Sequence, residues 1–276
     1  MNAQIDTLPF FLDALGFIQH WLLALGFTMA RPMGFLAIFP VFTRFQITGL
    51  LRGAMALVLA LPAVPMIAYM LDQQPQTGVA LMLLGVKEGS IGCILGLLLG
   101  MPFWMLDVAG DVLDLQRGAT QGRLNDPAGF EDVSITGTFF LLLSIAYFAA
   151  SGGLQMMVDI LYKSWELWKP LSGIPNFSDQ FPILVLGLLD EMLAAAISLA
   201  LPMLLAMLLS DIALSIVSRA ASSLRVDDYA MGARNVVFFF ILTLYTSYLC
   251  LFVRQDIARM PIFFDAMKLM VEQPLT

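Results

Sequence analysis

Residues 235–253 read NVVFFFILTLYTSYLCLFV, an apolar run that contains no Asp, Glu, Lys or Arg. Residues 192–210, MLAAAISLALPMLLAMLLS, form a second uncharged run, and residues 89–106 and 133–158 form two more. A helix needs about 20 largely apolar residues to cross the hydrocarbon layer of a membrane. Three of these runs are that long or nearly so, and the apolar residues 77–86 extend the run at 89–106. The four runs therefore predict membrane helices.

The composition of the whole chain indicates the same class. Of the 276 residues, 59% are hydrophobic and 13% are charged, whereas soluble domains carry about 25% charged residues. Residues 10–30 and 50–71 are two further apolar stretches. No repeated segments alternate with a period of two, as the strands of a membrane β-barrel do. We therefore expect an all-α, polytopic membrane protein of about six hydrophobic helices, because helices pair their own backbone groups.

Prolines and polar segments interrupt the apolar runs. Proline removes a backbone hydrogen bond and bends a helix, so we expect partly kinked helices at Pro62, Pro65, Pro102 and Pro202. The polar segments predict loops at residues 31–49, 72–77, 107–132, 163–182 and 219–234. Lys and Arg show only a weak bias between alternate loops, which leaves the membrane orientation open.

Some charged residues fall within the apolar segments or near their ends: Lys87, Glu88, Asp159, Asp190 and Glu191. An ionisable side chain is costly in hydrocarbon, so in a membrane helix it faces protein or water. Two interpretations remain open. These residues either turn toward the protein interior or lie at or beyond the membrane surface.

Motifs that carry catalytic chemistry are absent from the sequence. It contains no GxSxG, no HExxH and no phosphate-binding GxxxxGK[ST] motif. Cys93 and Cys250 lie in apolar runs, and the single histidine, His20, has no nearby metal-ligand pattern, so we interpret all three as structural. The net charge of −7 argues against nucleic-acid binding. Residues 1–9 have no basic residue, unlike a signal peptide. We expect no enzymatic activity, no cofactor and no metal.

Residues 107–119, DVAGDVLDLQRGA, contain the pattern most typical of a functional site. Asp107, Asp111 and Asp114 are spaced to lie on one face of a helix. Arg117 follows Asp114 by three residues, a spacing at which the two side chains can pair. A carboxylate stripe of this kind can line an aqueous passage or form a solvated helix face, and the spacing leaves both open.

Glycines recur every three or four residues in the third apolar segment, at Gly85, Gly89, Gly92, Gly96 and Gly100. Small residues at this spacing allow a second helix to approach closely. That helix can belong to the same chain or to another subunit, and the sequence favours neither.

Residues 104–127 resemble a segment shared by the T subunit of the type III secretion export apparatus and the flagellar FliR protein. The QRGA form of residues 116–119 is more similar to the injectisome branch of this family than to the flagellar branch. The matching residues are Trp104, Ala109, Gly110, Asp111, Asp114, Gln116, Gly118, Asp126 and Pro127.

Four further blocks resemble the family in the same order along the chain. They are residues 29–44 with Arg31, Gly34 and Pro40, residues 87–104, the pair Gly152 and Gly153, and residues 200–235 with Pro202, Asp211, Arg219 and Leu224. Residues 219–227, RAASSLRVD, depart from the family pattern by lacking its Pro and Asn. The resemblance thus spans nearly the whole chain, although it does not carry over the role of that one loop.

The resemblance implies a non-enzymatic, pore-forming subunit of the export gate in the bacterial inner membrane. Part of the assembly would lie above the membrane plane on the periplasmic side. The implied partners are five R and four S subunits for each T subunit, the switch protein (U subunit), the large export-gate ring (V subunit), a cytoplasmic ATPase, the unfolded secreted proteins that pass through, and membrane lipids.

The resemblance also implies a division of the chain and a set of site residues. Residues 1–182 would form an R-like portion, and residues 183–276 an S-like helical hairpin with a tail. The candidate gate or constriction residues are Asp107, Asp111, Asp114, Gln116 and Arg117. The candidate subunit contacts are Arg219, Arg234, Gly92, Gly96 and Gly100. A flagellar export gate and a small-molecule transporter are the alternatives, but transporters often have two similar halves, and no such repeat is evident.

Overall fold

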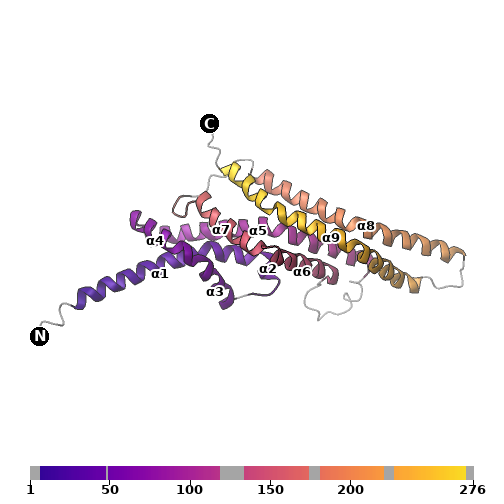
Figure 1. Ribbon diagram of the computed structural model, residues 1–276, viewed down its shortest axis with the longest axis horizontal. Coiled ribbons are helices and arrows are strands. Elements are labelled where there is room, and N and C mark those ends of the chain that lie inside the picture. The colour runs from indigo at the N-terminus through magenta and orange to yellow at the C-terminus, as the bar shows by residue number, and fades with distance from the viewer. Residues whose placement is uncertain (1–6, 48, 119–133, 174–180, 221–226, 272–276) are drawn as a thin grey trace. The chain divides into compact units, whose positions relative to one another are not determined.

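The computed structural model describes residues 7–47, 49–118, 134–173, 181–220 and 227–271, and all regular structure in these ranges is helical (Figure 1). Within these described residues, five helical segments are long and apolar enough to cross a membrane: Ala14–Ile38, Gly49–Gln73, Gly78–Arg117, Val185–Ala220 and Tyr229–Gln255. The number is six if Ile135–Ala150 and Gly153–Leu167 together make one span. The prediction of an all-α, polytopic membrane protein is therefore confirmed. The helices are α1 (Thr7–Ile38), α2 (Pro40–Thr43), α3 (Gly49–Ala60), the short 3₁₀ helix η1 (Leu61–Ala63), α4 (Val64–Gln73), α5 (Gly78–Arg117), α6 (Ile135–Ala150), α7 (Gly153–Leu167), α8 (Phe181–Ala220) and α9 (Asp227–Val271).

The chain forms two compact units. Unit 1 comprises Met1–Gly100, Leu154–Ser178 and Phe263–Thr276, and unit 2 comprises Met101–Gly153 and Asp179–Ile262. The predicted division into residues 1–182 and 183–276 concerns resemblance to other subunits rather than compactness, and it stays a prediction.

Several of the predicted loops are wrong over part of their length, since residues 163–167 belong to α7 and residues 227–234 to α9. Residues 31–38 continue α1 as helix, and residues 107–117 continue α5 as helix. In both places the charged residues that suggested a loop, Arg31 and the pair Asp114 and Arg117, are buried against oppositely charged or polar partners. In these two places the charged residues therefore form buried ion pairs and are not exposed to solvent. The remainder of the second loop, residues 119–133, and the motif residues Asp126, Pro127 and Leu224 lie outside the described residues.

The prolines act in two ways. Pro62 lies in η1 and Pro65 in the first turn of α4, so the predicted kink divides this apolar segment into α3 and α4. Pro102 and Pro202 instead lie inside α5 and α8, which are uninterrupted. The apolar run at 133–158 is broken between α6 and α7 at Gly152, whose φ of 81° is a conformation that favours glycine.

A buried guanidinium joins three helices of unit 1. The Arg31 side chain on α1 is fully buried, and its Nε and Nη2 atoms lie 2.8 and 2.7 Å from Oε2 of Glu88 on α5. Its Nη1 donates to Oγ of Ser164 at 2.9 Å, and Nη2 donates to the carbonyl oxygen of Trp168 at 2.9 Å. The Trp165 ring lies 5.5 Å from the guanidinium carbon. Arg31 thereby joins α1, α5 and the end of α7.

Lys87 extends this network to the turn that follows α7. Its Nζ lies 3.0 Å from Oε1 of Glu88 and donates to the carbonyl oxygens of Pro170, Ser172 and Lys169 at 2.7, 3.0 and 3.2 Å. The Lys87 and Glu88 side chains are only 8% and 2% exposed. Lys87 and Glu88 therefore turn toward the protein interior, which was the first of the two interpretations given for charges in apolar segments.

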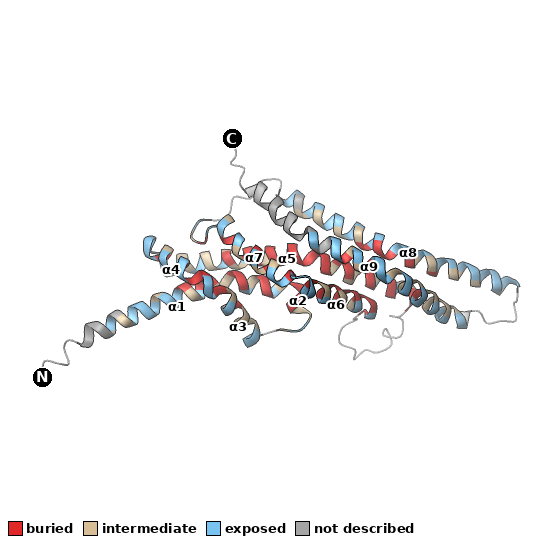
Figure 2. Cartoon of the chain, in the orientation of Figure 1, coloured by how far each residue is buried: buried red, intermediate tan, exposed pale blue. Residues whose placement is uncertain are grey.

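The other charges in the apolar segments face outward. Asp190 and Glu191 are exposed on α8. Asp159 is exposed on α7, and its carboxylate lies 2.7 Å from Nζ of Lys163 one helical turn later. Exposure is general on the last two helices: in the most apolar part of α8 only 28% of residues are buried, and in that of α9 only 17%, against 61% in α5 (Figure 2).

Apolar packing joins α1 to α4 in unit 1. The buried cluster consists of Ala24, Phe27, Val64, Ile67, Ala68 and Leu71. At its edge, His20 Nε2 lies 3.2 Å from the carbonyl oxygen of Ala68 and 3.4 Å from Oδ1 of Asp72. These contacts are consistent with the structural role predicted for His20.

The glycines of α5 give α1 its close approach. A Cβ added at Gly92 would overlap the carbonyl oxygen of Arg31, and one added at Gly96 would lie 2.8 Å from that of Phe35. Gly34 on α1 is equally crowded by the backbone of α5 at Gly89. For Gly92 and Gly96 the structure thus shows packing within the same chain. Gly100 is buried. A contact between these glycines and another subunit stays a prediction.

We predict that Gly92→Ala destabilises the protein, because the new methyl group would force α1 away from α5. Overpacking of this kind costs about 1–3 kcal/mol. Gly85→Ala is the matched control on the same helix, because nothing lies within 4 Å of its added Cβ. Thermal unfolding in detergent, followed by tryptophan fluorescence, should give a lower midpoint for Gly92→Ala and an unchanged or slightly higher one for Gly85→Ala. Equal midpoints would contradict the packing described.

Candidate functional site

The end of α5 carries a buried carboxylate that binds the start of α6. Asp114 is 1% exposed. Its Oδ2 accepts hydrogen bonds from Oγ of Ser134 and the backbone N–H of Thr136, both at 2.9 Å, and its Oδ1 accepts one from Oγ1 of Thr136 at 2.5 Å. Ser134 is itself the N-cap of α6 and accepts from the N–H of Gly137 at 2.8 Å. A carboxylate at a helix N-terminus is also favoured by the helix dipole.

Arg117 neutralises this carboxylate. Its Nε and Nη2 atoms lie 2.8 and 2.6 Å from Oδ1 of Asp114, and Nη2 also donates to Oγ1 of Thr136 at 3.0 Å. The predicted pairing of Asp114 with Arg117 is therefore confirmed. The guanidinium carbon lies 4.6 Å from the centre of the Phe238 ring and 5.8 Å from that of Phe239, so a cation–π contact joins α5 to α9. We call Asp114, Arg117, Ser134 and Thr136 the clamp.

The other two aspartates lie on the same side of α5, where α6 crosses. A Cβ added at Gly110 would overlap the backbone of Gly137, so the two helices meet at their glycines. A Cβ added at Gly137 would lie 2.8 Å from Oδ1 of Asp111 and 2.9 Å from Oδ1 of Asp107. The three carboxylates therefore all approach the first turn of α6, with Asp114 buried, Asp107 half-buried and Asp111 exposed. In the single chain Asp114 is therefore not part of a solvated face, and its role in a passage stays a prediction.

A second ion pair joins α8 to α9, the two helices of the predicted S-like hairpin. Nε of Arg234 on α9 donates to Oδ1 of Asp211 on α8 at 2.7 Å, and both side chains are 27% exposed. Nη1 of Arg234 also lies 3.5 Å from the carbonyl oxygen of Gln116. The structure thus brings Arg234, predicted as a subunit contact, next to the candidate gate residue Gln116. Arg219 is exposed in the last turn of α8.

Sequence reasoning missed several residues of this site. Ser134 and Thr136 were not singled out, although a serine immediately before an apolar run is a typical N-cap. Phe238 gave no separate signal, because it lies within a run of aromatic and aliphatic residues. No group of three or more metal-ligating side chains occurs in the part of the chain that the structure describes. The arrangement is that of a structural junction with a charged centre, formed by α5, α6 and α9.

Residues 22–260 match the family of bacterial export proteins, family 1. This chain belongs to that family. The matched segment includes the clamp, the ion pair of Asp211 with Arg234, and Arg31 with its buried partners. Individual relatives of this export protein match over most of their length as well. It is 32% identical over 238 residues to the surface presentation of antigens protein SpaR of Salmonella typhimurium, covering 85% of this chain and 87% of the relative.

Two further relatives illustrate the range of the family. The Yop proteins translocation protein T of Yersinia pestis is 32% identical over 232 residues, which is 83% of this chain and 87% of the relative. The flagellar biosynthetic protein FliR of Bacillus subtilis is 26% identical over 257 residues, which is 92% of each chain. The predicted resemblance is therefore confirmed at the level of the family.

We predict that Asp114→Asn lowers the stability of this export protein, because the buried Arg117 would lose its counter-charge. Breaking a buried pair costs about 3–5 kcal/mol. Asp190→Asn removes an exposed carboxylate from the same unit and serves as the control. Unfolding midpoints in detergent should fall for the first variant only. The double variant Asp114→Asn, Arg117→Met should be more stable than Asp114→Asn alone. If its loss of stability instead equals the sum of the losses in the two single variants, the two side chains are not coupled.

Proposed function

We propose that this export protein is the T subunit of a type III secretion export gate and that it forms part of the pore through which secreted proteins cross the bacterial inner membrane. The observation that carries the proposal is the match to two secretion proteins, SpaR and the Yop translocation protein T, at 32% identity over more than four fifths of each chain. The absence of catalytic motifs from the sequence supports a role without enzymatic activity.

The α8–α9 hairpin supports a role in an assembly. Most of its apolar residues are exposed in the single chain. Asp190 and Glu191 are exposed beside those apolar residues, and lipid tails offer ionised carboxylates no polar partner. We therefore propose that other subunits cover this hairpin, with residues 1–182 as an R-like portion and residues 183–276 as an S-like hairpin. In that arrangement one T subunit joins five R and four S subunits.

The clamp supports a role at the constriction. Asp114 and Arg117 precede residues 119–133, while Ser134 and Thr136 follow them, and the four side chains bind one another. The clamp thus joins the end of α5 to the start of α6. We propose that the clamp and the adjacent carboxylates, Asp107 and Asp111, lie at the narrow part of the pore, where the tightly packed charges would hold the gate shut.

The remaining parts of the proposal concern location and partners. The chain would lie in the inner membrane, with part of the assembly above the membrane plane on the periplasmic side. The switch protein, the large export-gate ring and the cytoplasmic ATPase would lie below. Arg219 would contact a neighbouring subunit. The alternative is a flagellar export gate, favoured by the FliR match over 92% of both chains. The higher identity to the secretion proteins and the QRGA sequence at 116–119 favour the injectisome.

Native mass spectrometry tests the assembly. The tagged chain would be expressed with its genomic neighbours and extracted in mild detergent. We expect a particle with one copy of this chain and several copies of two smaller membrane proteins, whose sequences then distinguish an injectisome from a flagellum. A monomer or homodimer, obtained while the neighbours are well expressed, would reject the proposal.

A secretion and ion-leak assay tests the gate. We expect Arg117→Ala to loosen the junction of α5 with α6 and so raise ion leakage and reduce secretion several-fold at equal amounts of assembled protein. Arg117→Lys keeps the charge and should have a smaller effect. Asp111→Asn alters an exposed carboxylate without breaking the clamp and should change secretion or leakage on its own. Asp159→Asn, on an exposed part of unit 1, is the control. If Asp111→Asn and Arg117→Ala both behave like the wild type, the gate role is wrong.

A further inference from the structure

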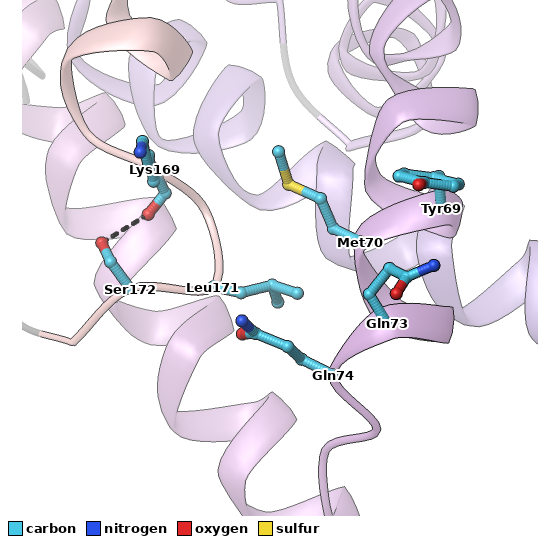
Figure 3. Close-up of a pocket in the computed structure, with 7 residues that line it drawn as sticks. All are labelled: Tyr69, Met70, Gln73, Gln74, Lys169, Leu171 and Ser172. Atoms are coloured by element: carbon cyan, nitrogen blue, oxygen red, sulfur yellow. Dashed lines mark hydrogen bonds between the residues drawn. The ribbon is translucent and has the colours of Figure 1, made fainter.

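A cleft of about 250 Å³ lies in unit 1 between the last turns of α4 and the turn that follows α7 (Figure 3). Leu171 extends from the turn toward α4, and the Gln74 amide extends from the end of α4 toward the turn. The lining residues are Tyr69, Met70 and Gln73 from α4, its C-cap Gln74, and Lys169, Leu171 and Ser172 from the turn.

The wall of the cleft on the turn side is held in place by side chains outside it. Lys87 Nζ binds the carbonyl oxygens of Lys169, Pro170 and Ser172, and Oγ of Ser172 donates to the carbonyl oxygen of Lys169 at 2.7 Å (Figure 3). Lys87 is in turn bound to Glu88. The cleft is therefore preformed, and a ligand would not have to order the turn, which lowers the cost of binding.

The cleft lies where two candidate membrane spans end. One candidate span is Gly49–Gln73 and the next begins at Gly78, so the length and composition of these helices would put Gln73 and Gln74 near the membrane surface. Tyr69, one turn earlier, is 66% exposed. Tyrosine and lysine are residues that commonly anchor a protein at this level of a bilayer. The cleft thus combines an apolar part, formed by Tyr69, Met70 and Leu171, with a polar part at the membrane surface.

The charge of the cleft favours an anion. None of its seven lining residues is acidic, and Lys169 is the one cation among them. Asp72, on the same helix, lies instead beside His20, 3.4 Å from its ring nitrogen. Two amides and an ammonium group can donate to the oxygen atoms of a phosphate ester. The apolar part matches the start of an acyl chain.

We propose that this cleft binds the headgroup of an anionic phospholipid, with the phosphate near Lys169, the Gln73 and Gln74 amides at the glycerol and phosphate oxygens, and an acyl chain along Tyr69 and Met70. The proposal rests on the chain being a membrane protein and is independent of the export-gate assignment. It gives unit 1 a specific lipid contact at the junction of α4 and α7.

Lipid titration of the full chain, purified in mild detergent with its partner subunits, tests this site. Native mass spectrometry would count bound lipid as phosphatidylglycerol or the zwitterionic phosphatidylcholine is added. We expect tighter binding of phosphatidylglycerol, and a loss of about fivefold in its apparent affinity for Lys169→Gln, the scale expected for one basic residue at a membrane surface. This variant should fold, because the polar contacts of Lys169 described above use its backbone oxygen. Gln74→Leu should weaken binding by a smaller factor.

Lys163→Gln is the matched control, because Lys163 is an exposed lysine on α7 outside the cleft. It should leave phosphatidylglycerol binding unchanged. Three outcomes would overturn the proposal: equal binding of the two lipids, equal losses for Lys169→Gln and Lys163→Gln, or cross-links from Lys169 to a partner subunit that show the cleft to be covered by protein. If millimolar inorganic phosphate displaces the lipid as effectively as phosphatidylglycerol itself does, the site binds free phosphate and the lipid assignment is wrong.

Discussion

The pairing of Arg31 with Glu88 is the interaction on which unit 1 depends. Moving a charged group out of water costs several kcal/mol even after the protein relaxes, so each side chain can stay buried only while the other is present. The guanidinium also donates to Ser164 and to the Trp168 carbonyl, which brings the end of α7 to the same point. Lipid supplies little hydrophobic force between helices, whose association in membranes relies on close packing and polar contacts. Gly92 lies one turn beyond Glu88 and lets the two backbones come close enough for the pair to form.

Unit 2 repeats this combination of a glycine crossing and a buried charge pair. Gly110 meets Gly137 where α5 crosses α6, and one turn later Asp114 binds Arg117 and the start of α6. Glycines determine how near the helices lie, while the directional hydrogen bonds determine which residues stand opposite one another. Because α5 carries both arrangements, its glycines and charges are spaced along a single helix. The contact of Arg117 with Phe238 then extends the second junction to the hairpin.

The sequence predicted local features well and distant partners poorly. The apolar runs located the spanning helices, Pro62 and Pro65 marked a real break, and the spacing of Asp114 and Arg117 predicted their ion pair. Arg31 was placed in a loop because hydropathy treats a charge as a sign of exposure. Its partner lies 57 residues away on another helix, beyond any local pattern. Ser134 and Thr136 were missed for the same reason, since they lie 20 and 22 residues from the carboxylate that they bind.

The length of α8 has a consequence for how the protein is made. A helix of 40 residues extends about 60 Å, twice the roughly 30 Å of hydrocarbon in a bilayer. Its exposed apolar residues run from Ile183 to Val217, which exceeds what lipid alone can shield. A newly inserted chain would therefore expose an apolar surface to water until another protein covers it. If the proposed assembly is correct, a copy made without its partner subunits would keep this surface exposed and be prone to aggregate.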